Sequence, residues 1–204
     1  MKKTTILFIL FLTGIMQAQD RPQPKPGKAP VVNIKKPQTF VLANGLKVMI
    51  VEDHKLPRVS YNLTLDNAPF AEGNKKGVDN LTSSLIGNEK KKIAKDIFNE
   101  EIDFFGANVN FSSQGAFASS LSKYALRILE LMADGALNPN FTQEEFDKEK
   151  AKMLEGLKAE EKSVTAIAGR VGDALKYRKN HPSGEFTTVE TLNNVTLADV
   201  QTNY

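Results

Sequence analysis

Three polar side chains in the stretch KKGVDNLTSSLIGNEKK, residues 75–91, stand at a spacing that would suit metal chemistry. Asn80 and Ser84 are one helical turn apart, and metal-binding helices of the H-E-x-x-H or H-x-x-E-H kind place their ligands at that spacing. Such a helix also carries a carboxylate to handle the proton, and Ser83 occupies that position here. An amide and two hydroxyls replace neither imidazole nor carboxylate. The stretch therefore predicts a helix with the spacing of an active-site helix but without its metal ligands and its general base.

The same stretch has the apolar period of an amphipathic helix. Its apolar residues recur at i, i+3, i+7 and i+8: Val78, Leu81, Leu85 and Ile86. At about 100° per residue, Asn80, Ser83 and Ser84 fall together on the opposite side. We therefore expect this helix to bury one face and to present the three polar side chains on the other.

The elements around this helix are short strands and further helices. Asn44-Gly45, between two apolar runs, predicts a β-hairpin with a type I′ turn. Ser122 predicts a helix N-cap, and the run from Thr142 to Glu145 predicts a capping box. Strands are expected over residues 40–43, 46–51, 59–65, 108–113 and 116–121, and helices over 78–86, 93–105, 122–137, 142–161, 163–177 and from 196 onward. This order predicts an α+β fold with a mostly antiparallel sheet covered by helices.

The composition is that of a globular domain, and it excludes several kinds of site. The chain has 204 residues, is 41% hydrophobic and 25% charged, and has a net charge of +3. Much of the positive excess lies in the first 40 residues, so we expect no nucleic-acid partner. The chain has no cysteine, which excludes disulfides and thiolate ligands. Its two histidines, His54 and His181, are about 127 residues apart, a poor start for a zinc site.

The N-terminal residues have the features of an export signal followed by a linker. Two lysines, the apolar run Ile6–Ile15 and the small residue Ala18 predict a signal peptide over residues 1–19. Residues 20–37 contain five prolines and five basic residues, which predicts an extended linker. We therefore expect an exported protein, periplasmic or secreted, with no transmembrane segment after the signal is removed.

From Thr39 onward, several stretches of the sequence, in order, resemble the N-terminal domain of the insulinase/pitrilysin/mitochondrial-processing-peptidase family, the inverted zincins. The family's F-x-L-x-N-G-L-x-V hairpin and third strand are matched by TFVLANGLKVMIVEDHKLPRVSYNLTL. In place of its G-x-A-H-x-x-E-H-M-x-F-x-G-T helix stands GVDNLTSSLIGNEKKKI, and its G-G/A-x-x-N-A-x-T-S strand resembles FFGANVNFSS. The helix pair and the HP-x-G ending resemble LSKYALRILELMADGALNPNFTQEEFDKEKAKMLEGLK and KNHPSGEFTTVETLNNVTLADVQTNY. The resemblance implies one insulinase-type domain over residues 38–204.

Residue by residue, the resemblance implies a site without its ligands. It places the two ligand histidines at Asn80 and Ser84, and the general-base glutamate at Ser83. The distal ligand glutamate falls on Gly156, or on Glu155 if the register is one residue off. The resemblance therefore implies no catalytic residue, no bound metal and no cofactor in this domain.

The resemblance also implies a role in holding peptides. Members of the family often work as two-part clamshells, with one catalytic half and one non-catalytic half that close around an unfolded peptide. The family's strand asparagine falls on Asn110, so Asn110 and Ser112 mark a candidate peptide-binding strand. This chain is then expected to be a non-catalytic half that partners a catalytic insulinase-type domain or subunit, in cis or in trans.

Two other interpretations stay open. The family continues with one or two more strands and a second domain, so we expect the domain to be truncated at Tyr204. If the sequence beyond Tyr204 carries a complete H-x-x-E-H helix, the chain is a fragment of a longer zinc-dependent endopeptidase. The third interpretation is a peptide- or protein-binding module unrelated to proteolysis.

Overall fold

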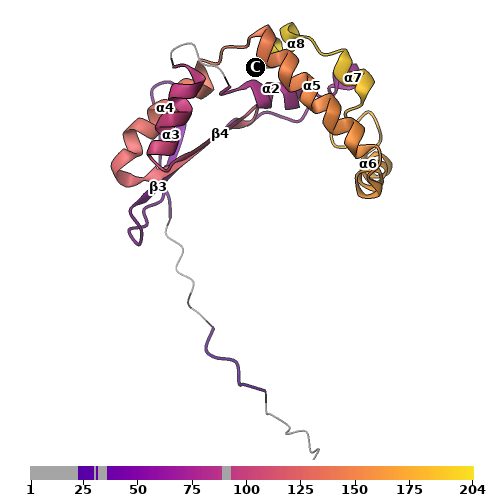
Figure 1. The fold of residues 1–204 in the computed structure, drawn as a ribbon. Helices are drawn as coiled ribbons and strands as arrows, with labels where there is room; N and C mark the ends of the chain where they lie inside the picture. The colour runs from indigo at the N-terminus through magenta and orange to yellow at the C-terminus, as the bar shows by residue number, and fades with distance from the viewer. Residues whose placement is uncertain (1–22, 30, 32–35, 89–92) are drawn as a thin grey trace, which may run out of the picture. The chain divides into compact units, whose positions relative to one another are not determined.

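The chain consists of two units, Met1–Glu52 and Asp53–Tyr204. The computed structural model in Figure 1 describes residues 23–29, 31, 36–88 and 93–204. The predicted signal peptide over residues 1–19 lies outside the described residues. The described residues of the predicted linker are exposed and form neither helix nor strand.

The first unit contains a two-stranded antiparallel sheet made by β1 (Gln38–Val41) and β2 (Lys47–Ile50). The predicted type I′ turn between these strands is wrong. That turn needs a positive φ at both central residues, and of the two only Gly45 has one, at 87°. The Gly45 amide donates to the Leu42 carbonyl at 2.9 Å, and the Leu42 amide donates to the Leu46 carbonyl at 2.9 Å. The hairpin therefore closes through a longer loop, with glycine at its single left-handed position.

The second unit contains a three-stranded antiparallel sheet in the order β3-β5-β4. The strands are β3 (Arg58–Thr64), β4 (Asn108–Ser112) and β5 (Gly115–Leu121), each close to its predicted bounds. Successive side chains point to opposite faces of a sheet. One face here packs in a core with α3 (Lys95–Phe104) and α4 (Ala125–Leu137). The side chains of the other face, on β3 and β4, are exposed.

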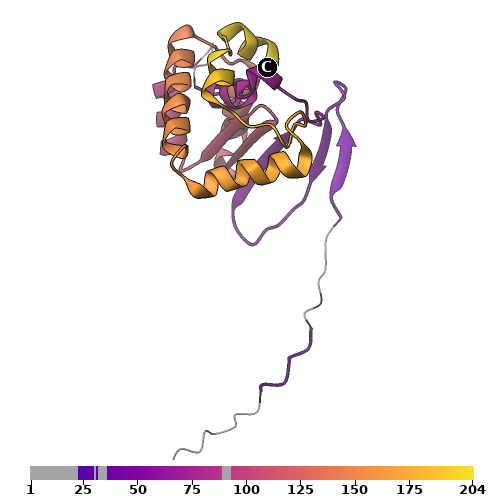
Figure 2. The ribbon, with the colours of Figure 1, turned by 90° about the vertical axis from the view of Figure 1, so that its right-hand side faces the viewer.

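Helices make up much of the rest of the second unit (Figures 1 and 2). They are η1 (Gly73–Lys75), α2 (Val78–Leu85), η2 (Ser122–Tyr124), α5 (Gln143–Glu160), α6 (Val164–Tyr177), α7 (Val189–Asn193) and α8 (Leu197–Asn203). Together with the antiparallel sheets, they confirm the predicted α+β fold class. Across the described residues, no helix has both the length and the apolar character needed to cross a membrane.

Two predicted helix starts differ from the structure. Ser122 is wrong as an N-cap, because it begins the 3-10 helix η2, and α4 starts only at Ala125. At α5 the predicted capping box is half formed. The Thr142 hydroxyl accepts from the Glu145 amide at 3.3 Å, but the Glu145 carboxylate pairs with two lysines instead of returning to the cap. Tertiary partners there compete with the local motif.

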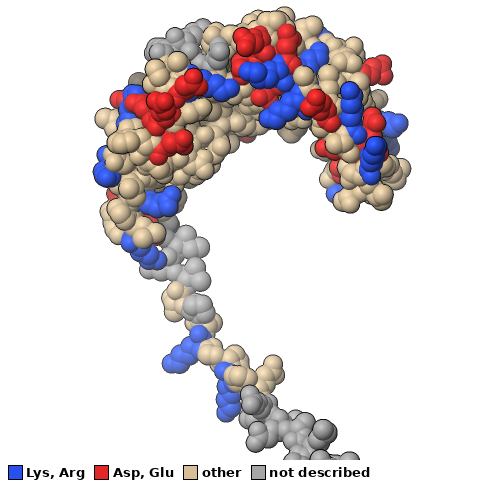
Figure 3. All heavy atoms as spheres, in the orientation of Figure 1, with Lys and Arg blue, Asp and Glu red and all other residues tan. Residues whose placement is uncertain are grey.

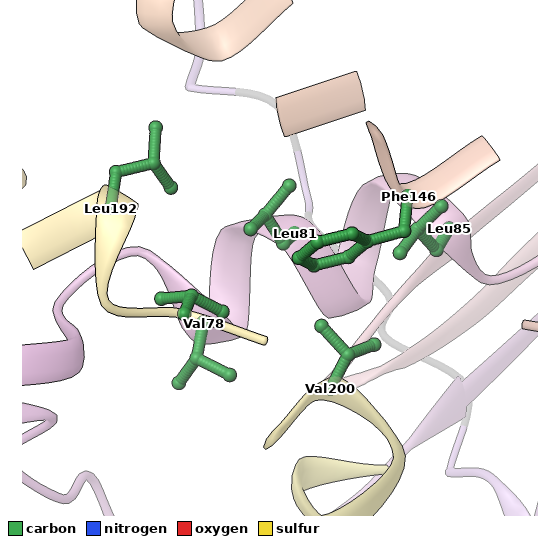
Figure 4. Packing of buried hydrophobic residues seen from close by; sticks show 7 residues of the cluster. Val78, Leu81, Leu85, Phe146, Leu192 and Val200 are labelled. Carbon is green, nitrogen blue, oxygen red and sulfur yellow. The ribbon is translucent and has the colours of Figure 1, made fainter. Parts of the chain in front are cut away.

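Two clusters of buried side chains form the core of the second unit. One lies between the three-stranded sheet and the helices α3 and α4. The other surrounds α2, and Figure 4 shows Leu81 and Leu85 of α2 close to Phe146 of α5, Leu192 of α7 and Val200 of α8. Burial of large apolar side chains is the main favourable term in folding. Three other helices therefore fix the position of α2.

Candidate functional site

A carboxylate from the preceding loop holds the start of α2. The chain enters the helix at Gly77 with a φ of 114°, a conformation that favours glycine. The Glu72 carboxylate accepts hydrogen bonds from the amides of Gly77 at 2.9 Å and Asp79 at 3.1 Å. Negative charge is favourable at a helix N-terminus, where backbone amides lack partners. This contact fixes where α2 begins and so which side chains it presents.

Lys76 joins Glu72 to a second carboxylate, that of Glu185 in the loop before α7. The Lys76 Nζ lies 2.5 Å from Glu72 Oε1 and 3.4 Å from Glu185 Oε1, and both carboxylates are largely buried. Burial lowers the pKa of Lys76, but hydrogen bonds and charge pairing with the two carboxylates raise it more, so the pKa lies above its ordinary value. The charged lysine therefore ties the start of α2 to the loop before α7.

The two faces of α2 have the character that the sequence predicts. Its apolar side chains are buried in the core shown in Figure 4. On the other side of the helix, Asn80 and Ser84 are exposed and Ser83 is half-buried. The three polar side chains that the sequence singled out therefore lie on the accessible side of α2.

Ser83 links α2 to the end of β4. Its Oγ accepts a hydrogen bond from the Ser113 amide at 3.0 Å and lies 3.2 Å from the Ser113 hydroxyl. Ser113 directly follows β4, in the turn that leads to β5. The residue at the predicted general-base position therefore joins a helix to a strand, and its hydroxyl oxygen is engaged in that contact.

Asn80 and Gly156 line the same hollow, between α2 and α5. The hollow has a volume of about 330 Å³. Its lining comes from α2, α5, α6 and the loop before α7: Asn80, Met153, Gly156, Leu157, Glu160, Arg170 and Thr187. Glu155 is exposed and is not part of this lining. Of the two registers considered for the distal position, the Gly156 register is the one that faces Asn80.

Two charged side chains that line the hollow were not identified in the sequence analysis. Arg170 of α6 pairs with Glu160 at the end of α5. Figure 2 shows α6 turning away from the end of α5, and this pair spans the corner between the two helices. Both residues lie on predicted helices, but their meeting depends on the angle between those helices. The spacing of Glu160 and Gly156, one turn apart on α5, was the only available signal.

The residues around the hollow do not fit a zinc site of the inverted-zincin kind. Such a site needs three side-chain ligands and an open position for water. Asn80 offers a neutral amide, Gly156 offers no side chain, and the hydroxyl oxygen of Ser83 is already hydrogen-bonded. Within the described ranges, no group of three His, Cys, Asp or Glu side chains could hold a metal ion. That these positions correspond to former ligands stays a prediction.

The candidate peptide-binding residues Asn110 and Ser112 lie on β4, which is the last strand in the sheet order. Both side chains are exposed, and Asn110 Nδ2 donates to Asn108 Oδ1 at 2.7 Å. The exposed residues of β4 and their register partners on β5 and β3 are all uncharged: Asn108, Asn110, Ser112, Gly115, Phe117, Ser119, Ser60, Asn62 and Thr64. Around β4, Figure 3 shows mainly uncharged residues, whereas charged side chains gather over α3, α4 and α5. An edge strand leaves backbone groups available for an added strand.

Solved structures with the same fold carry peptidase names. The chain matches a peptidase M16 inactive domain from Pseudomonas fluorescens with a TM-score of 0.71 and 24% identity, over 82% of this chain and 42% of that one. The chain has the M16 peptidase fold. A protease from Helicobacter pylori matches with a TM-score of 0.68 and 19% identity, over 83% of this chain and 42% of that one.

A third structure of the M16 fold is the periplasmic protease PqqL from Escherichia coli. It matches with a TM-score of 0.63 and 20% identity, over 85% of this chain and 21% of that one. The chain thus spans less than half the length of each of these three proteins. No protein-family model and no curated protein sequence matches the chain. The predicted resemblance to insulinase-type peptidase domains is confirmed for the fold.

Proposed function

We propose that this chain is an exported, non-catalytic domain of the M16 type that holds an extended peptide for a catalytic M16-type half. One observation carries the proposal. The hollow at the positions to which the resemblance assigns metal ligands is lined by Asn80 and Gly156, neither of which is a zinc ligand. Metal-assisted hydrolysis needs a metal to lower the pKa of water and a base to take its proton. The side chains at these positions supply neither.

The edge of β4 supports the peptide-holding part of the proposal. An extended peptide adds to an open sheet edge through backbone hydrogen bonds, and this mode needs no catalytic side chain. The exposed side chains of β4 are Asn108, Asn110 and Ser112, which are short enough to leave the edge accessible. Lysine on an edge strand, by contrast, is a common means of preventing strand addition.

The apolar face of α6 supports the partner part of the proposal. No residue of α6 is buried. Its exposed apolar side chains fall on one face of the helix: Val164, Ile167, Val171 and Leu175. A contiguous apolar face of this kind marks a surface for protein contact. A catalytic M16-type half, in cis or in trans, is the partner that the proposed function requires.

Export is part of the same proposal and rests on the sequence. The predicted signal peptide over residues 1–19 would direct the chain out of the cytoplasm, and the proline-rich linker over residues 20–37 would tether the folded part. The periplasmic protease PqqL has the same fold, which agrees with a periplasmic location. Cell fractionation would place the mature chain in the periplasm or the medium, and a cytoplasmic chain with an intact N-terminus would contradict export.

A second candidate function is favoured by the length of the matched proteins. The chain spans 42% of two of them and 21% of the third. If additional sequence carries a complete H-x-x-E-H helix, the whole protein is a zinc endopeptidase and this domain is its holding half. Expression of the complete gene product, with a protease assay before and after chelation, separates this candidate from a catalytically silent protein.

Peptide binding tests the proposed function directly. The full chain is titrated into a fluorescein-labelled extended peptide of about 10 residues, the length of a long strand. We expect binding without cleavage, and we expect Asn110→Lys to weaken it roughly tenfold because a charge on the edge opposes strand addition. The matched control is Asn62→Lys, since Asn62 lies on β3 in register with Asn110 through Phe117. Equal loss in both variants, or cleavage of the peptide by the pure chain, would refute the proposal.

A further inference from the structure

The hollow between α2 and α5 lies beside the end of β4. Ser83, which binds Ser113 just past β4, follows Asn80 by three residues on the same side of α2. Three residues advance an α-helix by about 4.5 Å. A peptide paired along β4 toward its C-terminal end therefore arrives next to the side chain that opens into the hollow.

The lining of the hollow combines an apolar wall with polar side chains and has no net charge. Met153 and Leu157 of α5 contribute an apolar wall, and Asn80 contributes a neutral amide. The two charged residues of the lining, Glu160 and Arg170, are paired with each other. A charged ligand group would have to displace one of these partners, whereas an uncharged apolar group could pack against Met153 and Leu157 and leave the pair intact.

Gly156 keeps the hollow open. A Cβ atom added at this position would meet no heavy atom within 4 Å. Glycine inside a helix is unfavourable relative to alanine, so its use here is not explained by helix formation. At about 330 Å³, the hollow is at the lower end of the size range of ligand pockets, about 300–1,000 Å³. That size suits one large side chain better than a whole small-molecule ligand.

We propose that this hollow is a pocket for one large, uncharged apolar side chain of the peptide held on β4. The inference rests on the proposed peptide-holding function, and it adds the chemical class of the peptide. The exposed side chains of β4, Asn108, Asn110 and Ser112, are also uncharged, which favours the same class along the rest of the peptide.

Guest-residue peptides test the pocket. A labelled Ser/Thr-rich host peptide of about 10 residues carries one central guest: leucine, alanine, aspartate or lysine. We expect the leucine peptide to bind the wild-type chain roughly tenfold more tightly than the alanine peptide, and the charged guests to gain nothing over alanine. Gly156→Phe, which fills the hollow, should make the leucine and alanine peptides equal. Gly172→Phe is the matched control, because a Cβ there also meets open space but lies outside the lining.

The outcomes separate the pocket from the function on which it rests. If Gly156→Phe keeps the preference for leucine, or if the wild-type chain has none, the pocket is refuted and peptide holding stands. Gly156→Phe could instead weaken binding of the leucine and alanine peptides equally, while thermal unfolding shows that the chain is folded. The hollow would then lie on the path of the peptide backbone, and the pocket would again be refuted. If no host peptide binds, or if Asn110→Lys has no effect, the proposed function itself fails.

Discussion

Gly156 and Ser83 occupy two of the positions that the resemblance assigns to the metal site, and neither offers a carboxylate there. Gly156 stands about one turn before the end of the 18-residue helix α5, where it lines the hollow without filling it. Ser83 uses its hydroxyl oxygen to join α2 to the turn after β4. The sequence resemblance predicts that both positions correspond to carboxylates of a catalytic domain. Here one position supplies space and the other supplies a structural contact.

Replacing Gly156 with alanine should stabilise the chain. Alanine is favoured over glycine in a helix interior by roughly 0.5–1 kcal/mol, and the added Cβ meets nothing within 4 Å. Urea unfolding of Gly156→Ala should therefore give a free energy of unfolding higher by about that amount. A lower value would mean that another group packs against this position, which would undermine the open hollow.

Ser83→Ala should destabilise the chain by about 1 kcal/mol, because it leaves the Ser113 amide without its hydrogen-bond acceptor. Ser84→Ala is the matched control on the same helix. Ser84 is exposed, so its replacement should change the free energy of unfolding by less than about 0.5 kcal/mol. The two variants are compared by urea unfolding under the same conditions. Equal effects would argue against a special contact at Ser83.

At the scale of elements, capping and packing decide where helices begin. Thr196 and Asp199 form a complete capping box at α8, and the Thr196 hydroxyl accepts from the Asp199 amide at 3.3 Å. The Asp199 carboxylate also pairs with Lys75, which lies just before α2 in the chain. The hydrogen bond from Lys75, followed by those from Thr196, lowers the pKa of Asp199 from 3.8 to about 2.

Acid should weaken the fold through Asp199. A carboxylate whose pKa is depressed on folding stabilises the native state above its unfolded pKa and loses that contribution as the pH falls through its folded pKa. The loss here should therefore occur between about pH 4 and pH 2. Asp199→Asn should cost about 1–2 kcal/mol at neutral pH and flatten the pH dependence of stability in that window. An unchanged acid profile in the variant would contradict this assignment.

Periodicity allowed prediction of most elements, whereas local motifs were less reliable. The apolar face of α2 and the strands of the second unit followed from spacing alone, since burial of one face imposes that spacing. The hairpin turn did not, because only Gly45 takes a positive φ. The box at Thr142 was incomplete because Glu145 found lysine partners from outside the motif. Arg170 could not be placed at the hollow, because its position depends on the angle between two helices.

For the whole molecule, the chain has the M16 fold over 82–85% of its length but spans less than half of each matched structure. The unpartnered apolar face of α6 belongs to this scale, because a domain of this size does not leave such a face exposed without reason. The proposed function assigns it to contact with a catalytic half. The fold followed from sequence resemblance, while the hollow and the α6 face required the structure. The vacant ligand positions stay a prediction of that resemblance.

Charge on the α6 face should disrupt that partnership. The tagged full chain is used to retrieve M16-type peptidases from a periplasmic extract, identified by mass spectrometry through their H-x-x-E-H sequence. We expect Val171→Glu to reduce the recovery of such a peptidase, because it buries a charge in an apolar interface. Thr165→Glu, which lies off this apolar face of α6, should leave recovery unchanged. If Val171→Glu left the recovery unchanged, the partner would have to bind another surface of the chain.

The zinc content of the purified chain tests the central claim most directly. Elemental analysis after dialysis against micromolar zinc should find no stoichiometric metal in the wild-type chain. The positive control combines Asn80→His, Ser83→Glu, Ser84→His and Gly156→Glu, and it should bind about one zinc per chain if these positions correspond to the family's ligands. About one zinc per wild-type chain, lost when Asn80 and Ser84 are both replaced by alanine, would contradict the account.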